Sequence, residues 1–211
     1  MDAVPRLWPG ATVFVVGGGP SLAALDAERL RGRGRVVAVN EAGLPGEEAW
    51  RIPFADVHFW GDRRFHDWNR ERFSGDFPGL RVTAMGGRRP AAVPIDCWLG
   101  RDRKGALSAD PARLCGECSG GMAINLAFLA GAARIVLVAF DMRTVGGRSH
   151  GHDCHKAPSN VRRYDKAFVP AIQRMAPRLR RAGVEVLNAT PGSALGCFPI
   201  LSLDEVLACR W

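Results

Sequence analysis

One stretch near the start of the chain decides its fold: Thr12-Val-Phe-Val-Val-Gly-Gly-Gly-Pro-Ser-Leu22. Its first part, residues 13–16, is mostly β-branched and predicts a short buried strand. The three glycines permit a tight turn and a close approach of a ligand to the backbone, and Ser21 offers an N-cap to a helix beginning near Leu22. Unpaired N–H groups at such a helix start suit a phosphate. The stretch therefore indicates a nucleotide or phosphate site, or else only a tight strand-to-helix turn.

The composition is typical of one globular domain spanning residues 1–211, with 47% hydrophobic and 24% charged residues. No apolar run approaches the ~20 residues of a membrane helix. The first ten residues do not resemble a secretory signal, so we expect a cytoplasmic protein. Six widely scattered cysteines predict free thiols and no disulfide in a reducing compartment.

The chain is basic, with a formal charge of +8 from 29 Lys and Arg against 21 Asp and Glu, and nearly all of the positive charge is arginine. Arginine favours bidentate contact with phosphate. Such a surface attracts nucleic acid, anionic glycans or nucleotides, unless the arginines only cover solvated helix faces. Composition leaves both interpretations open.

Strands alternate with helices along the chain, which predicts a single Rossmann-like α/β domain with a mostly parallel central sheet flanked by helices. Each predicted strand is a short apolar run that ends at a polar residue or a glycine. The predicted strands are residues 13–16, 35–39, 55–60, 80–84, 134–140 and 184–187, and the predicted helices are residues 21–31, 63–73, 119–132 and 160–183.

Two segments lack a clear period. Residues 86–118 carry prolines and many arginines, and we expect an irregular covering segment or active-site flap there. Residues 141–160 form a loop with three of the five histidines. In the long helix that follows this loop, Pro170 is expected to cause a kink, and Pro177 is a second candidate.

The carboxyl ends of parallel strands meet at one edge of a sheet, where such folds bind ligands. Polar residues and glycines fall at these ends, together with the start of the helix at residue 119, and their shared edge predicts a nucleotide site. A dinucleotide fingerprint and a P-loop are both disfavoured, because the required glycine, acid and Gly-Lys-Ser/Thr are missing. The predicted nucleotide-binding residues are Gly17, Gly18, Gly19, Pro20, Ser21, Asn40, Gly61, Asp62, Ser119, Gly120 and Asp141.

The densest cluster of reactive groups is Ser149-His-Gly-His-Asp-Cys-His155. Its spacing approaches the zinc motif of metallo-β-lactamase-like hydrolases, but a cysteine stands where the aspartate belongs, and no later histidine completes that site. A structural zinc site with Cys115 and Cys118 is a further alternative. General acid–base catalysis by one histidine fits better, because histidine titrates near neutral pH. Loop histidines without a role are the remaining interpretation.

The order of these motifs resembles that in two related families. The bacterial CMP-sialic-acid-dependent sialyltransferases share a Gly-x-Gly-Pro-Ser-Leu turn, an Asn that ends the second strand, a Ser-Gly helix start before an apolar strand ending in x-Asp, and a Ser-His-x-x-x-His loop. The Rossmann-like 6-hydroxymethylpterin diphosphokinases, with similar uncharacterised phage and prophage proteins, form the second group. The resemblance runs from residue 13 to about residue 195 and implies a glycosyltransferase A-like domain.

In the sialyltransferases, a late histidine deprotonates the acceptor hydroxyl, and tyrosines steady the leaving phosphate. The resemblance implies that His155 is the base, or His152 one alignment gap away. This chain has a single tyrosine, Tyr164, and Arg143 is the candidate to neutralise the phosphate instead. The same resemblance implies that the glycine turn and Asn40 hold the nucleotide and that Ser119 and Gly120 contact the donor.

These observations predict a nucleotide-dependent transferase that moves a sugar from a nucleotide-activated donor to an acceptor hydroxyl. A CMP-type donor requires no metal. The second hypothesis is ATP-dependent diphosphate transfer of the pterin diphosphokinase type, with Mg²⁺ held by Asp141 or Asp62. The third is a non-catalytic nucleotide or nucleic-acid binding module. The acceptor class (glycan, small molecule or nucleic acid) and a homo-oligomeric state are left open by the sequence.

Overall fold

Parallel strands build the central sheet of the computed structural model, which describes residues 2–45, 51–73, 76–90, 93–103, 105–153 and 160–209. Within these residues the sheet has seven strands in the order β5-β4-β3-β2-β1-β8-β9, all pairing in parallel. The prediction of a single α/β domain with a parallel sheet is confirmed. The strands are β1 (Thr12–Val16), β2 (Arg35–Val39), β3 (Val57–Trp60), β4 (Leu80–Thr83), β5 (Cys97–Trp98), β8 (Arg134–Val138) and β9 (Glu185–Asn188).

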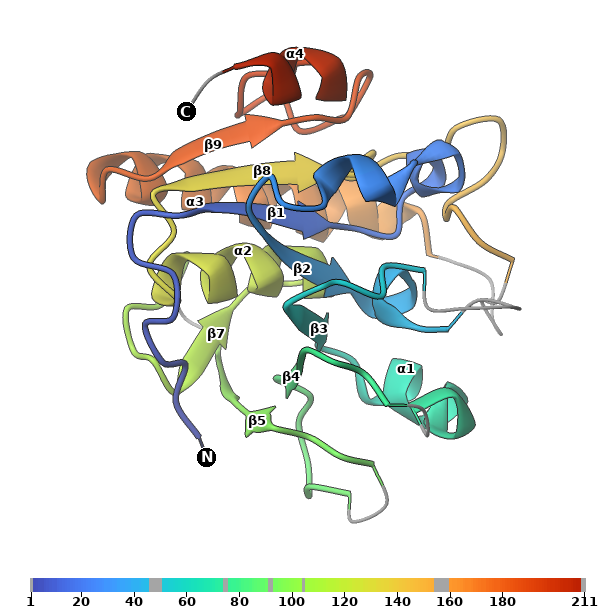
Figure 1. Cartoon of the computed structure of the whole chain (residues 1–211), viewed down its shortest axis with the longest axis vertical. Coiled ribbons are helices and arrows are strands. Elements are labelled where there is room, and N and C mark those ends of the chain that lie inside the picture. The colour runs from blue at the N-terminus through green and yellow to red at the C-terminus, as the bar shows by residue number, and fades with distance from the viewer. Residues whose placement is uncertain are drawn as a thin grey trace.

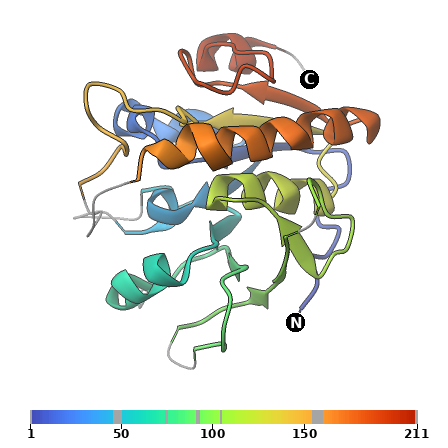
Figure 2. The same ribbon diagram turned by 180° about the vertical axis from the view of Figure 1, so that it is seen from behind.

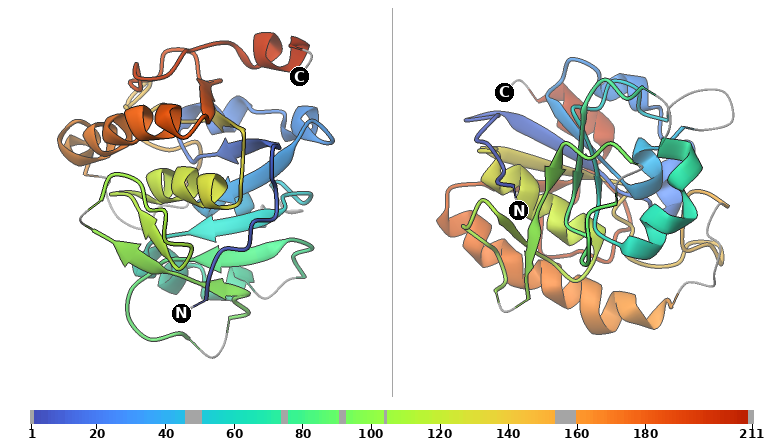
Figure 3. Two further views of the ribbon diagram at one scale, coloured as in Figure 1. Left: turned by 90° about the vertical axis from the view of Figure 1, so that its left-hand side faces the viewer. Right: turned by 90° about the horizontal axis from the view of Figure 1, so that it is seen from below.

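Both faces of the sheet are covered, which explains why its strands are almost continuously apolar. Side chains alternate along β1: Val13 and Val15 pack toward α2 (Ser119–Leu129) and α3 (Val169–Arg181), whereas Phe14 and Val16 pack on the opposite face. Figures 1 and 2 show α2 and α3 on one face. The side view in Figure 3 shows the other face covered by the early turns and α4 (Leu203–Ala208). No helix in the described ranges is long and apolar enough to cross a membrane.

The helix expected over residues 21–31 is replaced by two short 3-10 turns, η1 (Pro20–Ala24) and η2 (Ala27–Leu30). Gly19, and not Ser21, precedes the first turn. Asp26 separates the two turns. Its carboxylate accepts a hydrogen bond from the Glu28 N–H and so caps the start of η2.

The segment 86–118, expected to be irregular, contains short strands in its described residues. β5 joins the edge of the central sheet, and β6 (Gly100–Asp102) pairs in parallel with β7 (Arg113–Cys115). Asn125, fully buried on α2, holds this segment: its Oδ1 accepts from the N–H groups of Ser108 and Cys115 at 2.9 Å each, and its Nδ2 donates to the Ser108 carbonyl at 3.0 Å. The segment is therefore part of the packed domain, and tertiary hydrogen bonds replace the missing sequence period.

The long helix near the C-terminus begins with a widened turn. η5 (Tyr164–Phe168) is a π turn, in which the Val169 N–H donates to the Tyr164 carbonyl five residues earlier, and α3 follows it directly. Pro170, at the start of α3, has no N–H for the preceding turn, so the expected disturbance takes the form of a π turn. Pro177 lies inside α3, which continues to Arg181.

An aromatic cluster lies beside the ends of β2 and β3. It is next to η3 (Asn40–Gly43), α1 (Arg63–Trp68) and η4 (Arg70–Phe73). His58 of β3 is fully buried in it, stacked on Phe73 with ring centroids 5.5 Å apart. His58 Nε2 donates to the Asn40 carbonyl at 2.9 Å, because a carbonyl can only accept. Burial lowers the pKa of His58 to about 3 despite this bond, so the ring is neutral near neutral pH.

Asn125→Leu should lower the free energy of unfolding by roughly 3 kcal/mol, because two buried N–H groups and one carbonyl lose their partner. Urea unfolding followed by circular dichroism measures the change. Gln173→Leu, at an exposed position on α3, is the control and should change stability by less than about 0.5 kcal/mol. Equal stabilities of the Asn125 variant and the wild type would contradict the assignment.

His58 should make the protein sensitive to acid. Above pH 6.5 both the folded and the unfolded forms are neutral at this residue, but below it the unfolded chain binds a proton that the folded chain rejects down to about pH 3. This group alone lowers the free energy of unfolding by about 1.4 kcal/mol per pH unit in that window. His58→Gln keeps a donor for Asn40 without titrating. Parallel stability curves for wild type and variant between pH 6 and 4.5 would contradict this prediction.

Candidate functional site

The glycine turn lies at the point where the sheet order reverses, between β1 and β8. The Gly17 N–H donates to the Val138 carbonyl at 2.8 Å, and the Gly19 N–H donates to the Ala139 carbonyl at 3.0 Å. A Cβ on Gly17 would lie 2.7 Å from the Ala139 oxygen. These glycines are needed because the end of β8 approaches the turn closely.

The carboxylate of Asp141, after β8, occupies the place where the sequence suggested a phosphate. Its Oδ2 accepts from the Ser21 hydroxyl at 2.7 Å and from the Ser21 N–H at 3.2 Å, and a Cβ on Gly19 would collide with it. Ser21 is thus occupied within the protein. Gly18 differs from its neighbours: an added Cβ would meet no atom of the described residues within 4 Å, and this glycine lines a cleft.

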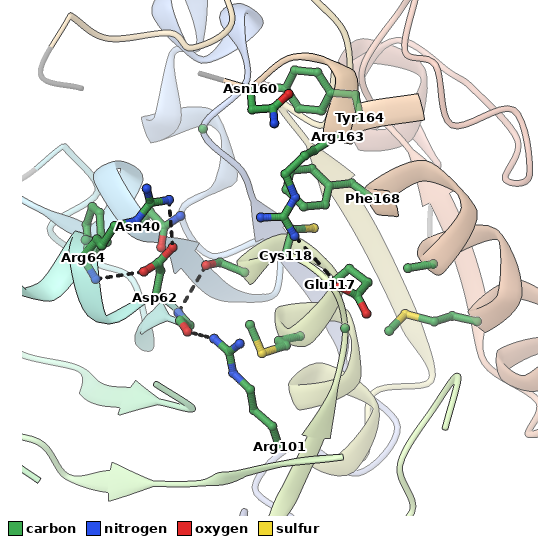
Figure 4. A pocket seen from close by; sticks show the side chains of 18 of the residues that line it. Asn40, Asp62, Arg64, Arg101, Glu117, Cys118, Asn160, Arg163, Tyr164 and Phe168 are labelled. Atoms are coloured by element: carbon green, nitrogen blue, oxygen red, sulfur yellow. Dashed lines mark hydrogen bonds and ion pairs between the residues drawn. The ribbon is translucent and has the colours of Figure 1, made fainter. Parts of the chain in front are cut away.

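The cleft has a volume of about 920 Å³ and follows the carboxyl edge of the sheet. It is large enough for a nucleotide with an attached sugar. Figure 4 shows side chains from α1, α2, η5 and the β6 region pointing into it. Of the predicted site residues, the cleft brings together Gly18, Asn40, Gly61, Asp62, Ser119 and His152, and its lining does not include Gly17, Gly19, Pro20, Ser21, Gly120, Asp141 or Arg143.

Asn40 is strained at the end of β2. Its φ is +53°, an unusual value for a residue other than glycine, and Oδ1 is buried without a hydrogen-bond donor in the described part of the chain. The His58 ring fixes the neighbouring backbone through the Asn40 carbonyl. Strain and an unsatisfied buried acceptor on a cleft wall are typical of a binding position.

Two predicted residues at the end of β3 are held by α2 and α1. The Gly61 N–H donates to the Ser119 hydroxyl at 3.2 Å, which fixes the start of α2 against the end of β3. Asp62 caps α1 by accepting from the Arg64 N–H at 2.8 Å, and its carboxylate also pairs with the Arg64 side chain at 3.6 Å. The structure therefore gives Asp62 a structural role in addition to its place on the cleft.

The histidine loop is attached to the glycine turn. The Gly151 N–H donates to the Gly18 carbonyl at 3.2 Å, and His150 and His152, on either side of Gly151, stack with ring centroids 5.2 Å apart and line the cleft. The Tyr164 hydroxyl donates to the Ser149 carbonyl at 3.0 Å and ties the loop to η5. His155, the base favoured from the sequence, lies outside the described residues.

Cations that the sequence analysis did not select also line the cleft. Arg163 stacks on Phe168 at 4.8 Å from its ring centre, lies 4.0 Å from the Glu117 carboxylate, and points into the cleft in Figure 4. Arg101 donates to the Gly61 carbonyl and, at 2.9 Å, to that of Ala84. A helical arginine gives no sequence signal that separates a cleft position from a solvated one.

Arg143 does not reach the cleft lining. A Cβ on Gly192 would lie 2.9 Å from its guanidinium, so the side chain packs toward the C-terminal loop. Cys118 caps α2, accepting from the Gly121 N–H at 3.4 Å, and burial raises the pKa of its thiol. Among the residues that the structure describes, no three His, Cys, Asp or Glu side chains gather as metal ligands.

Comparison with protein-family models gave no match, and comparison with curated proteins gave none either. Solved structures share the fold. The MAf glycosyltransferase from Magnetospirillum magneticum AMB-1 has a TM-score of 0.60 and 15% identity over 100% of this chain. The match covers 36% of that protein, so the present chain spans about a third of its length.

Two further structures are of the sialyltransferase CstII. One, from Campylobacter jejuni in complex with CMP as a substrate analogue, has a TM-score of 0.53 and 14% identity over 96% of this chain and 88% of that one. The other is a complex with a trisaccharide acceptor and CMP. It has a TM-score of 0.50 and 14% identity over 95% of this chain and 88% of that one. These neighbours support the sialyltransferase side of the resemblance at the level of the fold: the chain shares its fold with these glycosyltransferases.

Proposed function

We propose that this protein is a glycosyltransferase that moves a sugar from a nucleotide-activated donor to an acceptor hydroxyl. The observation that carries the proposal is one cleft lined by Gly18, by the strained Asn40 and by the stacked pair His150 and His152. A fold shared with glycosyltransferases, including one that binds CMP, supports the same class.

In this proposal the nucleotide lies along the ends of β1, β2 and β3. Gly18 leaves room for it, since the space above this residue is open. Asn40 uses its carboxamide on the base or ribose, which gives the buried Oδ1 a donor. Gly61 and Ser119, joined by a hydrogen bond, line the same cleft as Gly18 and Asn40 and contact the nucleotide there.

The transfer needs a base because an acceptor hydroxyl is a poor nucleophile. A histidine takes the hydroxyl proton, the oxygen attacks the anomeric carbon, and the bond between that carbon and the phosphate oxygen breaks, leaving the nucleotide with the negative charge. Among the described residues His152 is the candidate, and His155 keeps its candidacy from the sequence. Arg163, which points into the cleft, takes the charge-neutralising role predicted for Arg143.

A nucleotide should raise the melting temperature, and Gly18→Leu should abolish that rise. Within the part of the chain that the structure describes, the new side chain meets no atom near its Cβ but enters the cleft, so the fold survives while the nucleotide is excluded. Thermal shift with CMP, UDP, GDP and ATP, with and without Mg²⁺, is the measurement; a hundredfold excess over Kd corresponds to about 2.7 kcal/mol. Gly196→Leu, also without close neighbours and away from the cleft, should respond like wild type. A response only to ATP with Mg²⁺ would favour diphosphate transfer.

His152→Ala should reduce kcat by roughly 10²–10⁴, the usual contribution of a positioned base, with little change in nucleotide affinity. The assay is nucleotide release from CMP-, UDP- and GDP-sugars, and added imidazole should restore part of the loss. His155→Ala is measured in parallel, and His150→Ala should be milder. Unchanged kcat in both the His152 and the His155 variants would reject a histidine base in this loop.

A further inference from the structure

A second group of cations lies on the cleft wall formed by α3. Ala171, Arg174, Met175 and Arg178 recur at spacings of three and four, so they share one helix face, and all four line the cleft. Ala171 and Met175 are buried, while the two arginines are exposed. Arg178 is 14 residues beyond Tyr164, which is about 20 Å along a helix. This arginine pair is therefore well separated from the histidine loop that Tyr164 holds.

The β6 region adds two more arginines to the lining of the same cleft. Arg101 is anchored by the carbonyls of Gly61 and Ala84, and no carboxylate in the described ranges forms an ion pair with it. Arg103 follows β6, is exposed and lines the same cleft. Two arginines of the helix and two of the β6 region thus line one cleft.

Three of the four carboxylates among the described residues that line the cleft lie within 4.0 Å of an arginine. Glu41 pairs with Arg72 at 2.5 Å, Asp62 with Arg64 at 3.6 Å, and Glu117 with Arg163 at 4.0 Å.

Asp102 lies between Arg101 and Arg103, and its carboxylate accepts from the Gly105 N–H at 3.2 Å. Arg103, Arg174 and Arg178 form no ion pair with any described carboxylate. This end of the cleft therefore carries net positive charge. Arg174 and Arg178 are four residues apart on one helix, so their like charges repel each other.

We propose that the acceptor carries a phosphate or a carboxylate group, bound between Arg174 and Arg178 of α3 and Arg101 and Arg103 of the β6 region. The proposal rests on the transferase function proposed above. Guanidinium groups bind both anions through paired charge-assisted hydrogen bonds. Because donor site, histidines and arginines share one cleft, an acceptor held there by its anionic group extends along the cleft to bring its hydroxyl to the histidine loop, about 15 to 20 Å away.

The test measures binding of matched sugars: glucose, glucose 6-phosphate and glucuronate, by isothermal titration with CMP present to fill the donor site. At least one of the two anions should bind tenfold or more tightly than glucose, and which one does identifies phosphate or carboxylate. The double variant Arg174→Ala/Arg178→Ala should lose this preference while its CMP affinity changes less than twofold. Arg180→Ala/Arg181→Ala removes the same charge from α3 outside the cleft lining and should keep the preference.

Each failure has a separate meaning. If CMP, UDP and GDP all fail to bind, the assignment of the nucleotide donor site is wrong. The sugar titrations are then carried out without nucleotide and still test the anionic acceptor. If glucose binds as tightly as both anions, the anionic acceptor is overturned. It is also overturned if the Arg180/Arg181 control loses the preference equally, because the effect is then one of general charge. Retention of the preference in the Arg174/Arg178 variant overturns it as well.

Discussion

The contact between the Asp141 carboxylate and Ser21 joins the turn after β1 to the turn after β8, at the edge where these two paired strands end. From β1 the chain builds outward to β5 on one side and later returns to β8 and β9 on the other. The hydrogen bonds from Ser21 to Asp141, and from Gly17 and Gly19 to the end of β8, close this junction. A glycine-rich turn there is required by packing, and one residue of it, Gly18, remains open to a ligand.

Much of the fold could be predicted because its strands are buried on both faces. Apolar runs such as β1 and β8 stop at glycines or polar residues, and their carboxyl ends share an edge, so Asn40, Gly61 and Ser119 could be placed together without a structure. The short strands β5, β6 and β7 could not be predicted, because a strand of two or three residues is too short to show an alternating hydrophobic pattern. The position of β7 depends on tertiary hydrogen bonds from Asn125 to Ser108 and Cys115.

The site was harder to predict than the fold. A helix N-terminus was expected to offer N–H groups to a phosphate, but the N–H of Ser21 is bound by a carboxylate 120 residues later in the chain. The arginines of the long helix looked equally solvated in the sequence, and only the placement of α3 separates Arg174 and Arg178, on the cleft, from Arg180 and Arg181. Which of several similar charges faces a cleft depends on helix rotation, and a basic composition does not determine that rotation.

The π turn before α3 sets this rotation. A π turn holds about one residue more than an α turn, which rotates the following helix by up to about 100° relative to an uninterrupted one. η5 therefore couples two features: Tyr164 at its start binds the histidine loop, and Arg174 and Arg178 further along face the cleft. The histidine loop is held a second time through Gly151 and Gly18. The positions of the histidines and of the α3 arginines thus both depend on how the chain passes Pro170, which has no proposed chemical role of its own.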